Sequence, residues 1–96
     1  MPKPLSNKNQ PKLKVSIRSR EKHLFDGNVS TLTSINDTGE FDVLGYHANF
    51  VTLIKKYVLL DKGLSTQKKF EFDTAVLSVA SNKVDVYVGF EEELKA

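Results

Sequence analysis

One stretch of the 96-residue chain, Thr38 to Phe50, holds close together most of the side chains that could do chemistry. His47 follows Asp42 by five positions and several serines lie nearby in the sequence, so the residue types of a Ser-His-Asp triad are present. However, no Gly-x-Ser-x-Gly elbow accompanies them, and a chain this short has little volume for an enclosed pocket. We therefore expect no catalytic residue and no enzymatic activity.

Metal and cofactor sites are also disfavoured by residue type and spacing. Glu71 with Asp73, and the run Glu91-Glu92-Glu93, could chelate a cation, but a solvated strand face and a solubilising tail explain these acids better. The chain has no Cys and only two His, which excludes a disulfide framework and a cysteine-built zinc site. No Gly-rich phosphate loop is present. We expect no metal and no cofactor.

The same stretch is rich in turn-forming residues. Gly39 and Gly45 tolerate a positive φ, so the chain can reverse near each of them. Between the two turns Phe41, Val43 and Leu44 predict a short strand. The residues at the two turns are therefore expected on an exposed edge of the fold, which suits binding to a partner better than catalysis.

The elements that must position this edge are strands. Leu13, Val15 and Ile17 alternate with polar residues, which predicts a first strand with one solvated face. Asp26-Gly27-Asn28 predicts a turn that closes a second short strand. Lys83 precedes a period-two run that predicts an antiparallel hairpin with the strand before it. The further strands are expected at 23–26, 29–35, 50–54, 57–60, 68–73, 76–80 and 84–88.

Close spacing of short strands predicts an all-β fold, an antiparallel β-sandwich or flattened barrel of about 8–10 strands. We expect a flexible N-terminal tail at 1–11, the sandwich domain at 12–89 and a short C-terminal tail at 90–96. The isolated domain is expected to be a monomer. The predicted buried set includes Leu13, Val15, Ile17, Val29, Phe41, Phe70, Phe72, Leu77, Val79, Val84 and Val86.

Charge is unevenly distributed along the chain. Residues 1–22 hold seven Lys or Arg against one acid, and the rest of the chain holds seven against eleven. A basic leading segment suits nucleic acid or anionic lipid, but no aromatic residues interleave for base stacking, so we expect no nucleic-acid partner. No apolar run approaches the roughly 20 residues that span a bilayer, and the start lacks the apolar segment of a secretory signal. A soluble or membrane-peripheral protein without membrane insertion is expected.

Four segments, taken in order, carry a resemblance to a known family. They are Phe25-Asp26-Gly27-Asn28-Val29, Gly39-Glu40-Phe41, His47-Ala48-Asn49, and residues 77–86. Together they resemble the N-terminal β-sandwich of the epsilon subunit of F-type ATP synthases, over about Leu13 to Val88. The chain departs from the family pattern in three places: Gly45-Tyr46 replaces Pro-Gly, Asn49 replaces Pro, and Thr74-Ala75 replaces Gly-Gly. We expect a short form without the C-terminal helical hairpin of typical members.

The resemblance implies a non-catalytic rotor-stalk subunit, peripheral on the cytoplasmic side of the inner or plasma membrane, that couples proton-driven rotation to ATP synthesis. Its implied partners are the gamma subunit and the c-ring. Glu40 and His47 match family positions that face the ring, and electrostatic complementarity suits such a contact. Tyr46 could add apolar anchoring, and so could Phe50, which is equally suited to the core. The predicted ring-facing edge consists of Glu40, Phe41, Tyr46, His47 and Ala48.

A second class of function stays open at this point. A free-standing β-sandwich that binds some other protein, with no role in an ATP synthase, would show the same alternation and the same exposed turns. The departures from the family pattern at 45–46, 49 and 74–75 are compatible with such a paralogue.

Overall fold

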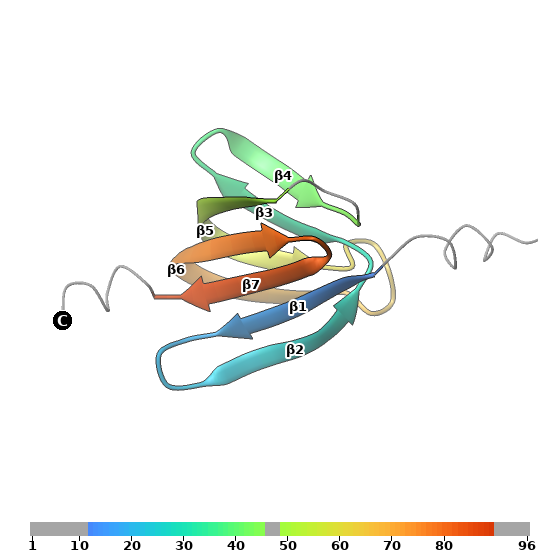
Figure 1. Ribbon diagram of the computed structural model, residues 1–96, viewed down its shortest axis with the longest axis horizontal. Helices are drawn as coiled ribbons and strands as arrows, with labels where there is room; N and C mark the ends of the chain where they lie inside the picture. Colours follow the sequence, from blue (N-terminus) through green and yellow to red (C-terminus); the bar gives the residue numbers. More distant parts are fainter. Residues whose placement is uncertain (1–11, 46–48, 90–96) are drawn as a thin grey trace, which may run out of the picture.

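A computed structural model describes residues 12–45 and 49–89 of the chain. In this part seven strands form one hydrogen-bonded sheet in the order β2-β1-β7-β6-β5-β3-β4 (Figure 1). The expected all-β class is confirmed. The strands are β1 (Leu13–Arg18), β2 (His23–Val29), β3 (Leu32–Asn36), β4 (Gly39–Val43), β5 (Phe50–Leu60), β6 (Lys68–Ala80) and β7 (Lys83–Val88).

The single sheet folds into two layers because β5 and β6 belong to both. Residues 50–55 of β5 pair with residues 74–79 of β6, whose other side continues through β7 to β1 and β2. Residues 58–60 of β5 pair with residues 68–70 of β6 on one side and, on the other side, with β3, which carries β4. Figure 1 shows β5 and β6 bending from the front of the molecule to the back. The core lies between the layers, where a cluster of buried aliphatic side chains gathers.

The bend is made by a β-bulge. Lys55 pairs with Thr74 and Lys56 pairs with Phe72, so Asp73 is one extra residue on β6. Because side chains alternate along a strand, one extra residue changes which ones face inward. Inward positions are accordingly Phe70 and Phe72 before the bulge, and Ala75, Leu77 and Val79 after it.

The bulge also explains why there are fewer and longer strands than expected. The segments expected at 50–54 and 57–60 are both parts of β5, and those at 68–73 and 76–80 are both parts of β6. Lys56 occupies the left-handed region with φ 78°, which a non-glycine residue rarely adopts. The chain therefore continues through a strained residue where the sequence predicts a break.

The sheet is not wholly antiparallel. β1 pairs with β7 in parallel, and the Lys14 amide donates to the Asn82 carbonyl at 2.8 Å at the start of this pairing. The other five strand pairings within the described residues are antiparallel, including the expected β6–β7 hairpin. A parallel partner from the far end of the chain buries β1 in the middle of its layer.

The turn expected at Asp26-Gly27-Asn28 is wrong. β2 runs straight through it to Val29, and the chain reverses only at Ser30 and Thr31. A Cβ placed on Gly27 would lie 3.1 Å from the ring of Phe25, so the ring occupies the space that a side chain would fill. Gly27 thus serves close packing within a strand, not a turn.

Burial follows the predicted alternation closely. Eight of the predicted core residues are buried: Leu13, Val15, Ile17, Val29, Leu77, Val79, Val84 and Val86. The other three, Phe41, Phe70 and Phe72, are only partly buried and pack against the core. Two aromatic pairs pack between the layers. The ring centroids of Phe25 and Phe70 are 5.8 Å apart, and those of Phe41 and Phe50 are 6.4 Å apart.

Candidate functional site

The predicted edge is only partly within the described residues. Glu40 and Phe41 lie on β4, which forms one edge of the sheet. Tyr46, His47 and Ala48 fall in the connection from β4 to β5 and lie outside the described residues. The predicted turn before the edge is present, since Asn36 Oδ1 accepts hydrogen bonds from the Thr38 amide and hydroxyl and Gly39 has a positive φ of 124°.

Glu40 is exposed, as expected, but it already has a partner. The Tyr57 hydroxyl on β5 reaches across β3 and donates to Glu40 Oε2 at 2.7 Å. This hydrogen bond, together with desolvation and the charges of Glu40 and Asp42, raises the pKa of Tyr57 above its ordinary value. Lys69 lies over the Tyr57 ring, 5.2 Å from its centroid, and holds the ring from the other side. Glu40 therefore lies on the outer face with a hydrogen-bond partner from β5.

Phe41 points the other way. Residues of β4 alternate, so Phe41 faces the core while Glu40 and Asp42 face solvent. Its ring meets that of Phe50 edge-on, at 73°. Phe50 packs against the core as well, so of its two possible roles the structure supports packing. These two rings anchor the edge strand.

The triad hypothesis gains no support from Asp42. Its carboxylate Oδ1 accepts a hydrogen bond from the Thr33 hydroxyl at 2.5 Å, across the β3–β4 pair. Within residues 12–45 and 49–89, no group of three or more His, Asp or Glu side chains is placed to hold a metal ion. That part of the chain also contains no helix with the length and apolarity that a membrane crossing requires.

A second surface was not identified from the sequence. Val51 and Leu53, on the outer face of β5, are 68% and 53% exposed. Leu53 is the register partner of Val76 on β6, which in turn pairs with Tyr87 on β7. We call Val51, Leu53 and Val76 the apolar strip. Val51 and Leu53 are exposed and Val76 is half-buried, and contiguous apolar surface of this kind is a candidate protein-binding surface.

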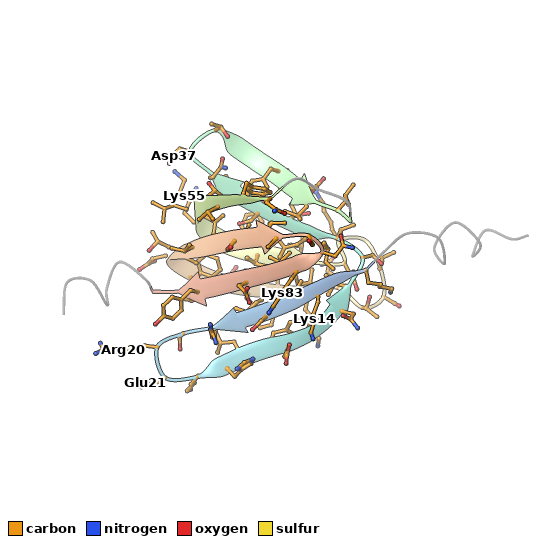
Figure 2. All side chains as sticks on the ribbon, viewed as in Figure 1. Lys14, Arg20, Glu21, Asp37, Lys55 and Lys83 are labelled. Carbon is orange, nitrogen blue, oxygen red and sulfur yellow. The ribbon has the colours of Figure 1, made fainter. Side chains whose placement is uncertain are left out.

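The apolar strip borders a shallow groove of about 350 Å³ beside the β3–β4 turn. Asn36 Nδ2 donates to Thr52 Oγ1 at 3.3 Å across the groove, and Lys55 pairs with Asp37 at 3.4 Å near one end of it (Figure 2). Both charged groups of that pair are well exposed, so it adds little stability. A signal for this surface did exist in the sequence, because residues 50–54 are apolar or β-branched on both faces of the strand.

Comparison with known proteins decides the family. The model of the ATP synthase delta/epsilon chain, beta-sandwich domain, matches residues 12–92. The chain belongs to this family. Membership confirms the resemblance seen in the sequence and favours an ATP synthase subunit over a free-standing module. Among curated protein sequences, none is similar enough to count as a match.

Solved structures of ATP synthases share the fold of this delta/epsilon sandwich. A chain of the Euglena gracilis mitochondrial ATP synthase, in an OSCP/F1/c-ring structure, has a TM-score of 0.72 and 17% identity over 83% of the present chain. A chain of the Tetrahymena thermophila central stalk and c-ring structure has a TM-score of 0.64 and 15% identity over 82%. The matches cover 52% and 64% of those two chains, so this chain spans between half and two thirds of their length.

Proposed function

We propose that this protein is a non-catalytic subunit of the central stalk of an F-type ATP synthase, peripheral to the membrane, that bridges the gamma subunit and the c-ring. The observation that carries the proposal is the family match across residues 12–92. The two similar structures, both of ATP synthases with their c-rings, support it at the level of the fold. The bridge would couple proton-driven rotation to ATP synthesis.

The two exposed surfaces fit two different partners. The apolar strip suits the gamma subunit, because the centre of a stable interface is apolar and loses its water on binding. The edge with Glu40, together with Tyr46, His47 and Ala48 of the following connection, suits the ring, because a carboxylate and an imidazole match cationic and amide groups on polar loops. Phe41 supports this edge from behind through Phe50.

The experiment replaces Glu40 and His47 together by Ala and measures two things. Gamma binding, assayed by pull-down, should survive, whereas proton-driven ATP synthesis by the reconstituted enzyme should fall. If both contacts are desolvated, ring docking should weaken by about 1–3 kcal/mol. The complementary variant Leu53→Asp places a charge in the apolar strip and should abolish gamma binding.

Tyr57→Phe is the matched control. Like the Glu40→Ala substitution, it removes the hydrogen bond between Tyr57 and Glu40, but it leaves the Glu40 and His47 side chains in place. If Tyr57→Phe lowers coupling as much as the double variant does, the loss comes from a weakened edge strand and not from the ring contact. Unchanged coupling in the double variant, or loss of gamma binding in it, contradicts the assignment of this edge. A wild-type protein that fails to bind gamma contradicts the stalk function itself.

A further inference from the structure

A cavity of about 290 Å³ opens at the end of the sandwich where β2 approaches the β5–β6 connection. Figure 1 shows this connection beside the end of β2, on the side of the molecule away from the β3–β4 turn. Its apolar wall is formed by Phe25, Val29 and Leu60, one from the middle of β2 and two from the ends of β2 and β5. The volume lies just below the range of about 300–1,000 Å³ that is typical of small-molecule pockets.

The groups at the rim of this cavity are hydrogen-bond donors and positive charges. Lys12 and Lys68 are both exposed and line the cavity, and Asn28 adds an amide. Of the described acids, none lies within 4.0 Å of either lysine ammonium, since the ion pairs found there involve Lys55 and Lys69. Two ammonium groups beside an apolar wall favour a ligand with a negative head and an apolar body.

The one acid that lines the cavity, Asp61, is occupied by the protein itself. Its Oδ1 accepts from the Ser30 amide at 2.6 Å and more weakly from the Thr31 amide at 3.4 Å, and its Oδ2 accepts from the Thr66 hydroxyl at 2.6 Å. Asp61 is only 6% exposed. It lowers the net positive charge of the cavity to one but offers little of its carboxylate to a ligand.

We propose that this cavity binds a small amphiphilic carboxylate, such as a medium-chain fatty acid. The carboxylate lies between the ammonium groups of Lys12 and Lys68, and the hydrocarbon chain lies against Phe25, Val29 and Leu60. A net charge of one favours a monoanion over a phosphate, for which the apolar wall offers nothing. The N-terminal segment 1–11 carries Lys3 and Lys8 and no acid, so its charge has the wrong sign for this cavity.

This proposal is independent of the stalk function, because the cavity shares no lining residue with the apolar strip or with the Glu40 edge. The test titrates the isotope-labelled protein with octanoate below its micelle concentration and follows backbone amide NMR signals. We expect saturable shifts centred on Phe25, Val29 and Leu60. The uncharged probe octan-1-ol, with the same chain length, should bind at least about tenfold more weakly, which corresponds to one charge-assisted contact.

The variant Lys12→Gln/Lys68→Gln should weaken octanoate binding by about tenfold or more and leave octanol unaffected. The matched control is Lys14→Gln/Lys83→Gln, which removes two lysines that are register partners on β1 and β7 (Figure 2). It changes the net charge equally and lies outside the cavity. All four substitutions are at exposed positions, so circular dichroism should show an intact fold.

Three outcomes overturn the proposal. Equal affinity for octanoate and octanol shows that the lysines do not recognise an anion. An equal loss in the two lysine variants shows a general effect of charge and no site. Signal shifts centred on Val51 and Leu53 show that the probe binds the apolar strip instead.

Discussion

Asp61 should be the most sensitive polar residue for stability, because it joins two reversals of the chain. Its carboxylate accepts hydrogen bonds from Ser30 and Thr31 between β2 and β3, and from Thr66 in the β5–β6 connection. Its own amide donates to the Thr31 carbonyl at 3.0 Å. Asp61 also has a φ of 55°, a left-handed conformation that Asp and Asn tolerate better than Ala does.

Substitution by Ala removes all three side-chain hydrogen bonds of Asp61. A hydrogen bond to a charged group contributes about 1.5–3 kcal/mol, but bonds within one network are not additive and water can reach part of this region. We therefore expect Asp61→Ala to lower the free energy of unfolding by about 2–4 kcal/mol, a large part of a typical total of about 5–15. Asp61→Asn keeps one acceptor and the left-handed conformation, so it should cost about 1 kcal/mol.

The pH dependence of stability gives a second readout. Burial alone would raise the pKa of Asp61, but the hydrogen bonds from Thr66, Ser30 and Thr31 and the charge of Lys12 outweigh it and lower the pKa below its ordinary value. A depressed pKa means that the stabilisation is complete above the unfolded-state pKa of about 3.9 and is lost as the pH falls through the folded-state value. The advantage of wild type over Asp61→Asn should therefore shrink below about pH 4.

Urea denaturation followed by far-UV circular dichroism measures both effects, and it suits a chain that has no Trp. Asp61→Asn serves as the conservative comparison for Asp61→Ala. A loss in Asp61→Ala of less than about half a kcal/mol, the range of ordinary surface substitutions, would refute the reasoning. So would a difference between wild type and Asp61→Asn that stays constant from neutral to acidic pH.

Two further changes test the core and the bulge. Val86→Asp should place an unpaired charge between Ile17 and Leu77, at a site that is 1% exposed, and cost several kcal/mol; a native-like cooperative melt would contradict the assigned inward face. Lys56→Gly should relieve the strain of a φ of 78° and raise the free energy of unfolding by about 0.5–1 kcal/mol after the entropy cost of glycine. Urea denaturation measures this change. A lower free energy of unfolding in Lys56→Gly would contradict the prediction, because it would mean that the lysine side chain stabilises the fold by more than the backbone strain destabilises it.

The part of the fold that could be predicted from sequence is the part governed by alternation. In β1 and β7, and in β6 on each side of its bulge, every second residue is apolar, and these residues face inward because only one face of each strand meets the core. The parallel pairing of β1 with β7 could not be predicted, since it joins residues about 70 positions apart and depends on the whole topology. The continuity of β5 and β6 was missed for a local reason, because Lys55-Lys56 and Thr74 lie at the bulge where the alternation shifts.

The candidate site divides in the same way. Turn chemistry around Asn36 to Gly39 correctly indicates that Glu40 is exposed on a short edge strand. Its hydrogen bond to Tyr57 depends on the order of strands in the sheet, because it crosses from β4 to β5 over β3. At Gly27 the sequence predicts a turn that the structure does not have. Glycine suits both a turn and a strand position covered by an aromatic ring, so the residue type alone does not distinguish these two roles.

The two proposed binding surfaces are connected through β5. Val51 and Leu53 precede the bulge, whereas Tyr57, which holds Glu40, follows it. Both halves of β5 are hydrogen-bonded to β6. The two surfaces therefore belong to one hydrogen-bonded sheet and not to two separate sheets. The proposed bridge needs its two contacts in a fixed relation, and a folded single sheet provides this without a hinge. The bulge and the left-handed Lys56 lie between the two surfaces, at the point where the paired strands bend.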